Sequence, residues 1–182
     1  MTPFLLAVSR RIDQVSYAAA RLAVALVLIC ALVSALNAMS RYLFGLSSNA
    51  WLELQWYMFG GIILLGAPYL LQRNGHIRVD LFYSKLNHRQ QHWLDLVGLI
   101  LFLLPFSVYM VVASWPWFVE AWVLQEISPN AGGLLRWPVK LLLPVGFFLL
   151  SAQGISELIK RIAALTGSIQ FDSSTHYERP IQ

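Results

Sequence analysis

Charged residues are scarce in this chain. Only 12% of its 182 residues are charged and 58% are hydrophobic, whereas soluble domains carry roughly 25% charged residues. Four long stretches contain no Asp, Glu, Lys or Arg at all, namely residues 22–40, 54–72, 96–119 and 141–156. This composition excludes a water-soluble protein built around a single core.

Residues for redox, metal or covalent chemistry are also few. The single cysteine, Cys30, excludes an intramolecular disulfide and a thiol oxidase that needs a cysteine pair. All four histidines lie outside the charge-free stretches, so they cannot ligate a haem inside a bundle. His88 and His92 are four residues apart but have no convincing third ligand. With no nucleophile motif or phosphate-binding glycine loop, we expect no enzyme, no metal site and no cofactor.

The four charge-free stretches predict four membrane-spanning helices. Crossing a hydrocarbon layer of about 30 Å takes about 20 helical residues, and the stretches hold 19, 19, 24 and 16 residues. The shortest can extend at both ends, because Lys140 and Lys160 can reach the headgroups. The predicted fold is an all-α integral membrane four-helix bundle within residues 1–166, with spans near 18–42, 51–72, 94–119 and 138–160 and a polar tail at 167–182.

The distribution of positive charge predicts the orientation of this bundle. Ten of the 13 Lys and Arg residues lie in the two terminal flanks and the link between the second and third stretches, against three elsewhere. Without the distant Arg179 the ratio is nine to three, so both termini are expected in the cytoplasm. The net charge of +4 therefore reflects orientation. No basic cluster with interleaved aromatic residues indicates a nucleic-acid partner.

Two links differ in character. Residues 76–96 mix apolar and charged side chains at a spacing that predicts an amphipathic helix on the cytoplasmic interface, over about residues 79–90. An ordinary polar loop is the alternative. Residues 125–138 contain two prolines and two adjacent glycines, which predict an externally exposed, turn-rich connection.

Tryptophan is concentrated at one end of the predicted bundle. Six of the seven tryptophans flank the outer ends of the spans, and only Trp93 lies at the inner end. An aromatic belt at the membrane interface explains most of them. Because a belt should serve both faces, the outer excess also allows contact between some of these rings and a protein partner.

The predicted spans contain almost no ionisable residues. Glu53 lies near the outer end of the second span, where either Arg41 or solvent at the headgroups can balance its charge. Gly60 and Gly61 permit close helix contact. A self-sufficient transporter is expected to show inverted repeats, broken helices or a buried charge at mid-membrane, and none is evident. Composition and spacing therefore favour a structural subunit.

Several segments together resemble a known family. Residues 37–83 (NAMSRYLFGLSSNAWLELQWYMFGGIILLGAPYLLQRNGHIRVDLFY), followed by LLPFSVY, SPNAGG and LPVGFFLL, resemble the small membrane subunit of tripartite ATP-independent periplasmic (TRAP) transporters, the DctQ-like family. The resemblance runs from about residue 24 to 165. Its most specific parts are Arg41-Tyr42, Trp51 with Glu53, and HIRVD at 76–80. The segments look most like the branch often labelled mannitol or chloroaromatic.

The resemblance implies a non-catalytic subunit of the bacterial inner membrane, surrounded by lipid and bound to a large membrane subunit that carries the substrate and sodium sites. A periplasmic binding protein would deliver an organic acid, usually a carboxylate, to the pair. Uptake would be coupled to sodium by an elevator-like motion of the large subunit, with the small subunit enlarging the fixed scaffold.

We assign candidate roles to two sets of residues on this basis. The candidates for the interface with the large subunit are Arg41, Trp51, Glu53, Gly60, Gly61, His76, Arg78 and Asp80. The candidates for docking the binding protein are Trp115, Trp122, Asn130, Arg136 and Trp137. The main alternative function is an autonomous, homo-oligomeric small transporter or channel, and a second alternative is an assembly chaperone for the large subunit.

Overall fold

The computed structural model describes residues 3–46, 48–75 and 86–166. Within these ranges the regular elements are helices: α1 (Pro3–Phe44), α2 (Asn49–Gln72), α4 (His88–Gly98), the π-helical segment η1 (Leu99–Leu103), α5 (Leu104–Val123) and α6 (Trp137–Leu165). Because α4, η1 and α5 run on as one helix, the described residues form four helices long and apolar enough to cross a membrane. The predicted all-α membrane fold is confirmed.

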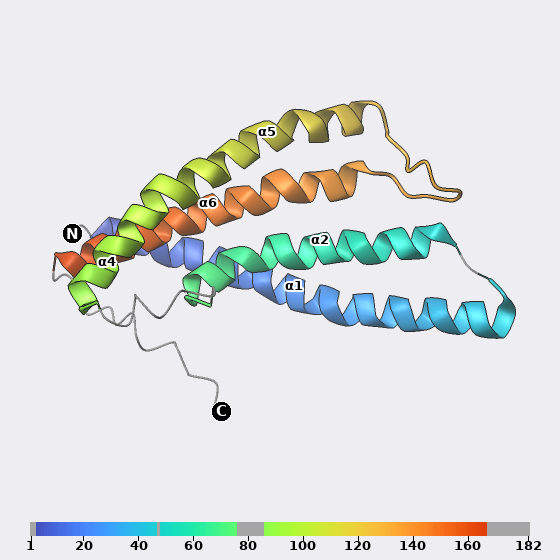
Figure 1. Cartoon of the computed structure of the whole chain (residues 1–182), viewed down its shortest axis with the longest axis horizontal. Helices are drawn as coiled ribbons and strands as arrows, with labels where there is room; N and C mark the ends of the chain where they lie inside the picture. Colours follow the sequence, from blue (N-terminus) through green and yellow to red (C-terminus); the bar gives the residue numbers. More distant parts are fainter. Residues whose placement is uncertain (1–2, 47, 76–85, 167–182) are drawn as a thin grey trace.

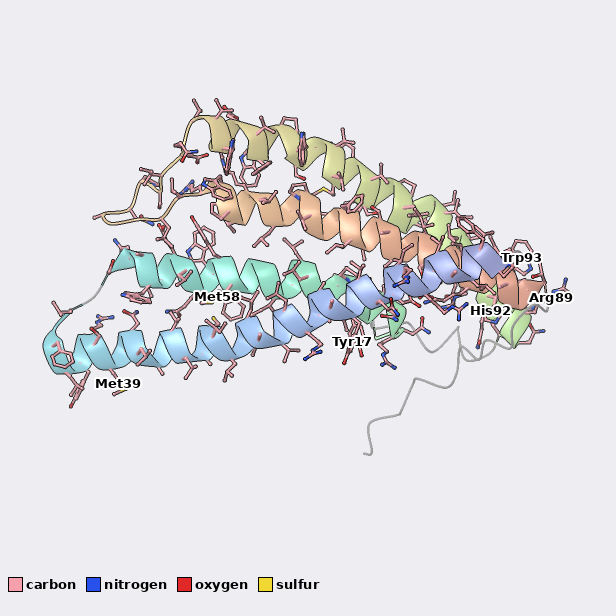
Figure 2. The ribbon with its side chains drawn as sticks, turned by 180° about the vertical axis from the view of Figure 1, so that it is seen from behind. Tyr17, Met39, Met58, Arg89, His92 and Trp93 are labelled. Atoms are coloured by element: carbon pink, nitrogen blue, oxygen red, sulfur yellow. The ribbon has the colours of Figure 1, made fainter. Side chains whose placement is uncertain are left out.

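The helices form two hairpins that lie side by side (Figure 1). One hairpin is α1 with α2 and the other is α5 with α6, and α2 packs against α6 between them. We call the end that carries links 45–48 and 124–136 the loop end, and the opposite end the termini end. Near the termini end α1 crosses α6, as the view from behind in Figure 2 shows.

The structure adds to the sequence prediction at two places. Helix α1 runs from Pro3 to Phe44, so it contains the predicted span near 18–42 and extends beyond it towards the N-terminus, where polar contacts with α6 hold its first turns. The interfacial helix predicted over 79–90 falls mostly outside the described residues. It does not run through Leu86 and Asn87, which are not helical, because Asn87 and Gln90 form a capping box that begins α4 at His88.

The π-helical segment has a local cause in the sequence. Pro105 is the second residue of α5 and has no backbone N–H, so it cannot donate to the carbonyl four residues earlier, and its ring would collide with that carbonyl. The chain adopts wider turns just before it, and the N–H of Leu104 bonds to the carbonyl of Leu99. A π-helical segment of this kind is one recognised way to relieve such a conflict within a long helix.

Helix α6 is the central helix, and two of its glycines allow close packing. A Cβ built at Gly146 would lie 2.6 Å from the Cβ of Leu64 on α2. A Cβ built at Gly154 would lie 2.8 Å from a methyl group of Leu103. Between them, Ser151 donates a hydrogen bond of 2.8 Å to Ser107 on α5. Small residues and short polar side chains therefore set the distance from α6 to its neighbours, as is usual between helices in lipid.

The contact at Gly146 yields a stability prediction. Gly146→Ala should destabilise the chain by about 1–3 kcal/mol, because the new methyl group overlaps Leu64. Gly66→Ala is the matched control: a Cβ at Gly66 meets nothing within 4 Å, and alanine favours a helix by about 1 kcal/mol over glycine. Thermal unfolding of the purified chain in detergent measures both. A Gly146→Ala protein as stable as the Gly66→Ala protein would contradict the packing described here.

Candidate functional site

A buried carboxylate organises the loop end. Glu53 lies near the start of α2, where Ser48 caps the helix by accepting a hydrogen bond from the N–H of Ala50. Only 2% of Glu53 is exposed. A charge held away from water requires hydrogen-bond donors on its oxygens, so its partners define what this site does.

All the donors recorded for Glu53 come from the link between α5 and α6. One carboxylate oxygen accepts hydrogen bonds from the hydroxyl of Ser128 and from the side-chain amide of Asn130, the latter at 2.7 Å. The other oxygen accepts the backbone N–H of Leu134 at 2.7 Å. We call these four residues the Glu53 cluster. It fastens the α5–α6 link to the first turns of α2, joining the two helical hairpins.

The link itself is a short, closed loop. Residues 127 and 135 form an antiparallel bridge, flanked by a 2.9 Å bond from the N–H of Ser128 to the carbonyl of Leu134. At the tip, Gly132 has φ +69, a conformation open mainly to glycine. A Cβ on Gly133 would lie 2.5 Å from the Cβ of Ser128. The segment SPNAGG thus supplies two of the three donors and the turn that brings the third, the N–H of Leu134, to Glu53.

A second charged group supports the base of the loop. Glu126 pairs with Arg136, at 3.6 Å, and with the ammonium group of Lys140 on α6. The hydrogen bond from Lys140 lowers the pKa of Glu126 below its usual range, with a smaller contribution from the charge of Arg136. Lys140 is buried and lies 4.4 Å from the centre of the Trp117 ring, a favourable cation–π distance. The first residues of α6 are thereby tied to α5.

The structure does not support the expected pairing of Glu53 with Arg41. Both oxygens of Glu53 are occupied by the loop, and its burial also excludes the alternative of a solvated carboxylate. Arg41 is exposed in the last turn of α1. It lines a pocket of about 520 Å³ between α1 and α2, together with Asn37, Tyr42 and Gln55. A cationic side chain among amide groups can receive an anionic or hydrogen-bonding partner.

The candidate tryptophans lie at the loop end. Trp115, Trp122 and Trp51 are exposed, whereas Trp137 is partly buried. The rings of Trp122 and Trp137 meet edge to face with centroids 4.5 Å apart. The structure brings these two together with Asn130 and Arg136 in one hairpin, but the side chains of Asn130 and Arg136 already bind Glu53 and Glu126.

The candidate glycines of α2 face other helices of the same chain. Gly61 is buried, and a Cβ on it would lie 3.0 Å from a methyl group of Leu26 on α1. A Cβ on Gly60 would lie 3.9 Å from Val139 on α6. Close packing therefore accounts for Gly61, whereas a Cβ at Gly60 would make only an ordinary van der Waals contact. The remaining interface candidates, His76, Arg78 and Asp80, lie outside the described residues.

A polar network that the sequence did not predict joins α1 to α6 near the termini end. The hydroxyls of Ser9 and Ser156 lie 2.7 Å apart, and Ser16 donates to Gln153 at 2.7 Å. Asp13 accepts from Gln153, Ser156 and Lys160 at distances of 2.8 to 2.9 Å. These contacts fix the crossing of the two helices.

Arg161 extends this network to α4 and the end of α2. The guanidinium lies 2.5 Å from the carboxylate of Asp95 and 3.3 Å from the ring of His92, and it donates to the side chain of Asn74 at 3.0 Å. Arg161 and His92 are both buried. By hydropathy, these residues belong to the polar segments that flank the predicted spans, where solvent contact is expected. One feature of the sequence could have indicated the polar network: polar residues recur on one face of α6, at positions 153, 156, 157 and 160.

The two polar regions were compared with the arrangement that a metal ion needs. No group of three or more His, Cys, Asp or Glu side chains within the described ranges is arranged to hold a metal ion. The recorded bonds connect helices and loops to one another. The arrangement is therefore suited to holding the helices at fixed positions.

Comparison with known proteins identifies one family. The sequence profile described as "Tripartite ATP-independent periplasmic transporters, DctQ component" matches residues 29–164. The match includes Glu53, the α5–α6 link and most of α6. Comparison with curated proteins and with solved structures gives no significant match.

Removing the carboxylate of Glu53 tests its role in ordering the loop. In Glu53→Ala the N–H of Leu134 loses its acceptor, so its hydrogen exchange should accelerate at least about tenfold. Glu120→Ala is the matched control, because Glu120 is an exposed carboxylate on α5 near the same end. Unchanged exchange at Leu134 in Glu53→Ala would show that the loop is ordered by other contacts.

Proposed function

The chain belongs to the DctQ family of TRAP transporters, and we propose that this small membrane subunit is a non-catalytic scaffold for the large one. The scaffold would hold the stationary part of the large subunit while that subunit's transport domain moves. The transported substrate would be an organic acid, delivered by a periplasmic binding protein and taken up with sodium. The branch suggested by the sequence remains a prediction.

One observation carries the scaffold proposal: towards the loop end the helices lie in the order α1, α2, α6, α5 as an open layer (Figure 1), whereas α1 reaches and crosses α6 near the termini end (Figure 2). As a result α1 and α5 lie at opposite edges with large exposed apolar surfaces. Only five of the 42 residues of α1 are buried, and only three of the 20 of α5. Lipid can cover such surfaces, but an open layer of this kind is also suited to lie along a larger membrane protein.

The distribution of charge favours a structural role for this chain over transport of ions by the chain itself. The ion pairs recorded within the described residues lie at the two ends of the molecule, at Glu126 and at the Asp13 and Arg161 contacts. Each long helix retains a stretch of at least 16 residues without a charge. A relay for ions or protons across the membrane requires ionisable groups in that middle region.

We place the termini end in the cytoplasm of a bacterial inner membrane, on the basis of the nine-to-three excess of positive charge on that side. The loop end then faces the periplasm. The α5–α6 link would form a preordered surface for the binding protein, because its internal bonds to Glu53 and Glu126 reduce the entropy lost on docking. Trp115 and Trp122 provide exposed aromatic area beside it.

For the large subunit we propose contacts near both membrane surfaces. Arg41 and its pocket between α1 and α2 would receive a polar group of the large subunit near the periplasmic side. His76, Arg78 and Asp80 would act near the cytoplasmic side. Glu53 acts indirectly in this scheme, by fixing the position of α2 beside the Arg41 pocket.

Reconstitution tests the assignment of function. The purified chain alone in liposomes should move no organic anion with or without a sodium gradient, whereas the complete three-component system should show sodium-driven uptake. Transport by the lone chain would establish the autonomous transporter instead. Absence of the chain from the purified working complex would favour an assembly chaperone.

Co-purification tests the proposed contacts. Arg41→Gln and Asp80→Asn should each lower the amount of large subunit recovered with the chain about tenfold, because each leaves a polar partner unsatisfied at the interface. Arg89→Gln, an exposed change of the same type on α4, should leave recovery unchanged. Normal recovery and normal uptake with both interface variants would refute the residue assignments.

A further inference from the structure

The pocket beside Arg41 brings together polar side chains that lack partners within the chain. Its walls come from one face of α1 and from the first turns of α2. Within the described residues, no hydrogen bond or ion pair is recorded for the side chains of Asn37, Arg41 or Gln55. The bond recorded at Gln55 uses only its backbone carbonyl, which accepts from Cys30. Three side chains with N–H donors therefore meet at one site without a recorded acceptor.

The amides of this pocket lie inside the helical layer. Helix α2 has 24 residues, or roughly 36 Å, so a hydrocarbon layer of about 30 Å centred on it would begin about two residues from each end. Gln55 lies six residues after Asn49, where α2 begins, and Asn37 lines the same pocket. Both amides would then lie within the hydrocarbon layer. Polar groups at that depth have no water to bind, so each needs a partner from protein or lipid.

Arg41 gives the pocket a positive charge that no neighbour balances. No acidic residue is among those that line the pocket, and the carboxylate of Glu53 is already bound at both oxygens by the α5–α6 link. The Cα–Cβ bonds of α1 point towards its N-terminus, so the side chain of Arg41 starts in the direction of the membrane centre. A cation held there is stabilised by an opposite charge. A carboxylate matches a guanidinium group, because it can accept two parallel hydrogen bonds from it.

The size and depth of the pocket favour a helix of a partner over a lipid. The pocket has a volume of about 520 Å³. One turn of helix, about 5.4 Å long and about 10 Å wide, fills roughly 420 Å³, so a single turn with an acidic side chain fits. The phosphate group of a lipid lies outside the hydrocarbon layer, whereas a transmembrane helix carries its side chains through that layer. The acid is therefore best supplied by a helix.

We propose that the pocket between α1 and α2 binds the carboxylate of an Asp or Glu on a transmembrane helix of the large subunit. The guanidinium group of Arg41 holds this carboxylate through paired hydrogen bonds, and the side-chain amides of Asn37 and Gln55 donate to its remaining lone pairs. This inference rests on the proposed function, because it takes the large subunit as the partner. It goes further by naming the acidic group and by adding Asn37 and Gln55 to the contact.

Gln55→Glu tests the charge of the partner group. The change keeps the size of the side chain but places a carboxylate beside Arg41, so it should neutralise the cation and repel the acid of the large subunit. Recovery of the large subunit with the affinity-purified chain should fall about tenfold. Gln125→Glu is the matched control, because Gln125 is exposed at the same end of the molecule and does not line the pocket. It should leave recovery unchanged.

Photo-cross-linking in the complete transporter identifies the occupant directly. Leu52 lines the pocket and is 51% exposed, so a diazirine-bearing amino acid of similar size is placed at this position and the membranes are irradiated before purification. We expect an adduct with a large-subunit peptide that has an Asp or Glu within one helical turn of the attachment site. Leu36 is the matched control, since it is exposed on α1 but does not line the pocket. The same probe there should not mark that peptide.

The outcomes separate this inference from the proposed function. Normal recovery with Gln55→Glu would show that the partner group is not acidic. A cross-link from position 52 to phospholipid, to a second copy of the chain or to a large-subunit segment without an acid would also overturn the inference. Each of these results leaves the scaffold role intact while the large subunit still co-purifies. Failure of the unmodified chain to recover the large subunit would instead refute the proposed function.

Discussion

Polar groups of a membrane protein must find their partners within the protein, and α6 meets most of that requirement for this chain. Its residues Ser156, Gln153 and Lys160 bind α1. Ser151 binds α5, and Arg161 binds α4 and the end of α2. Lys140 at the other end binds the α5–α6 link through Glu126. Because hydrophobic attraction does not drive helices together in lipid, these bonds and the glycine contacts fix the arrangement.

This arrangement separates two regions with different properties. The ends are polar and cross-connected, so the positions of the helices there are well determined. The middle is apolar and free of charge, and much of its surface on α1 and α5 is exposed. This distribution of polar and apolar residues, in the part of the chain that the structure describes, supports the proposed scaffold role for this member of the DctQ family.

Hydropathy and turn-forming residues were sufficient to predict the all-α membrane fold with four long apolar helices and the turn-rich α5–α6 link. They could not predict that α1 begins at Pro3, because the polar residues Ser9, Asp13 and Ser16 look like a solvated flank until α6 is placed against them. The partner of Glu53 was missed for a related reason. Arg41 is close in sequence and opposite in charge, whereas the actual donors are neutral groups about 80 residues away.

The central claim is that this subunit stays fixed to the stationary part of the large subunit during transport. Sodium-driven uptake by a cross-linked complex tests it most directly. The buried native cysteine, Cys30, can be replaced by serine, and Tyr42→Cys then gives a single attachment point, because Tyr42 is 89% exposed beside the Arg41 pocket. The account predicts that uptake continues after this cysteine is cross-linked to the large subunit. Loss of uptake on cross-linking, with full activity before it, would contradict the account.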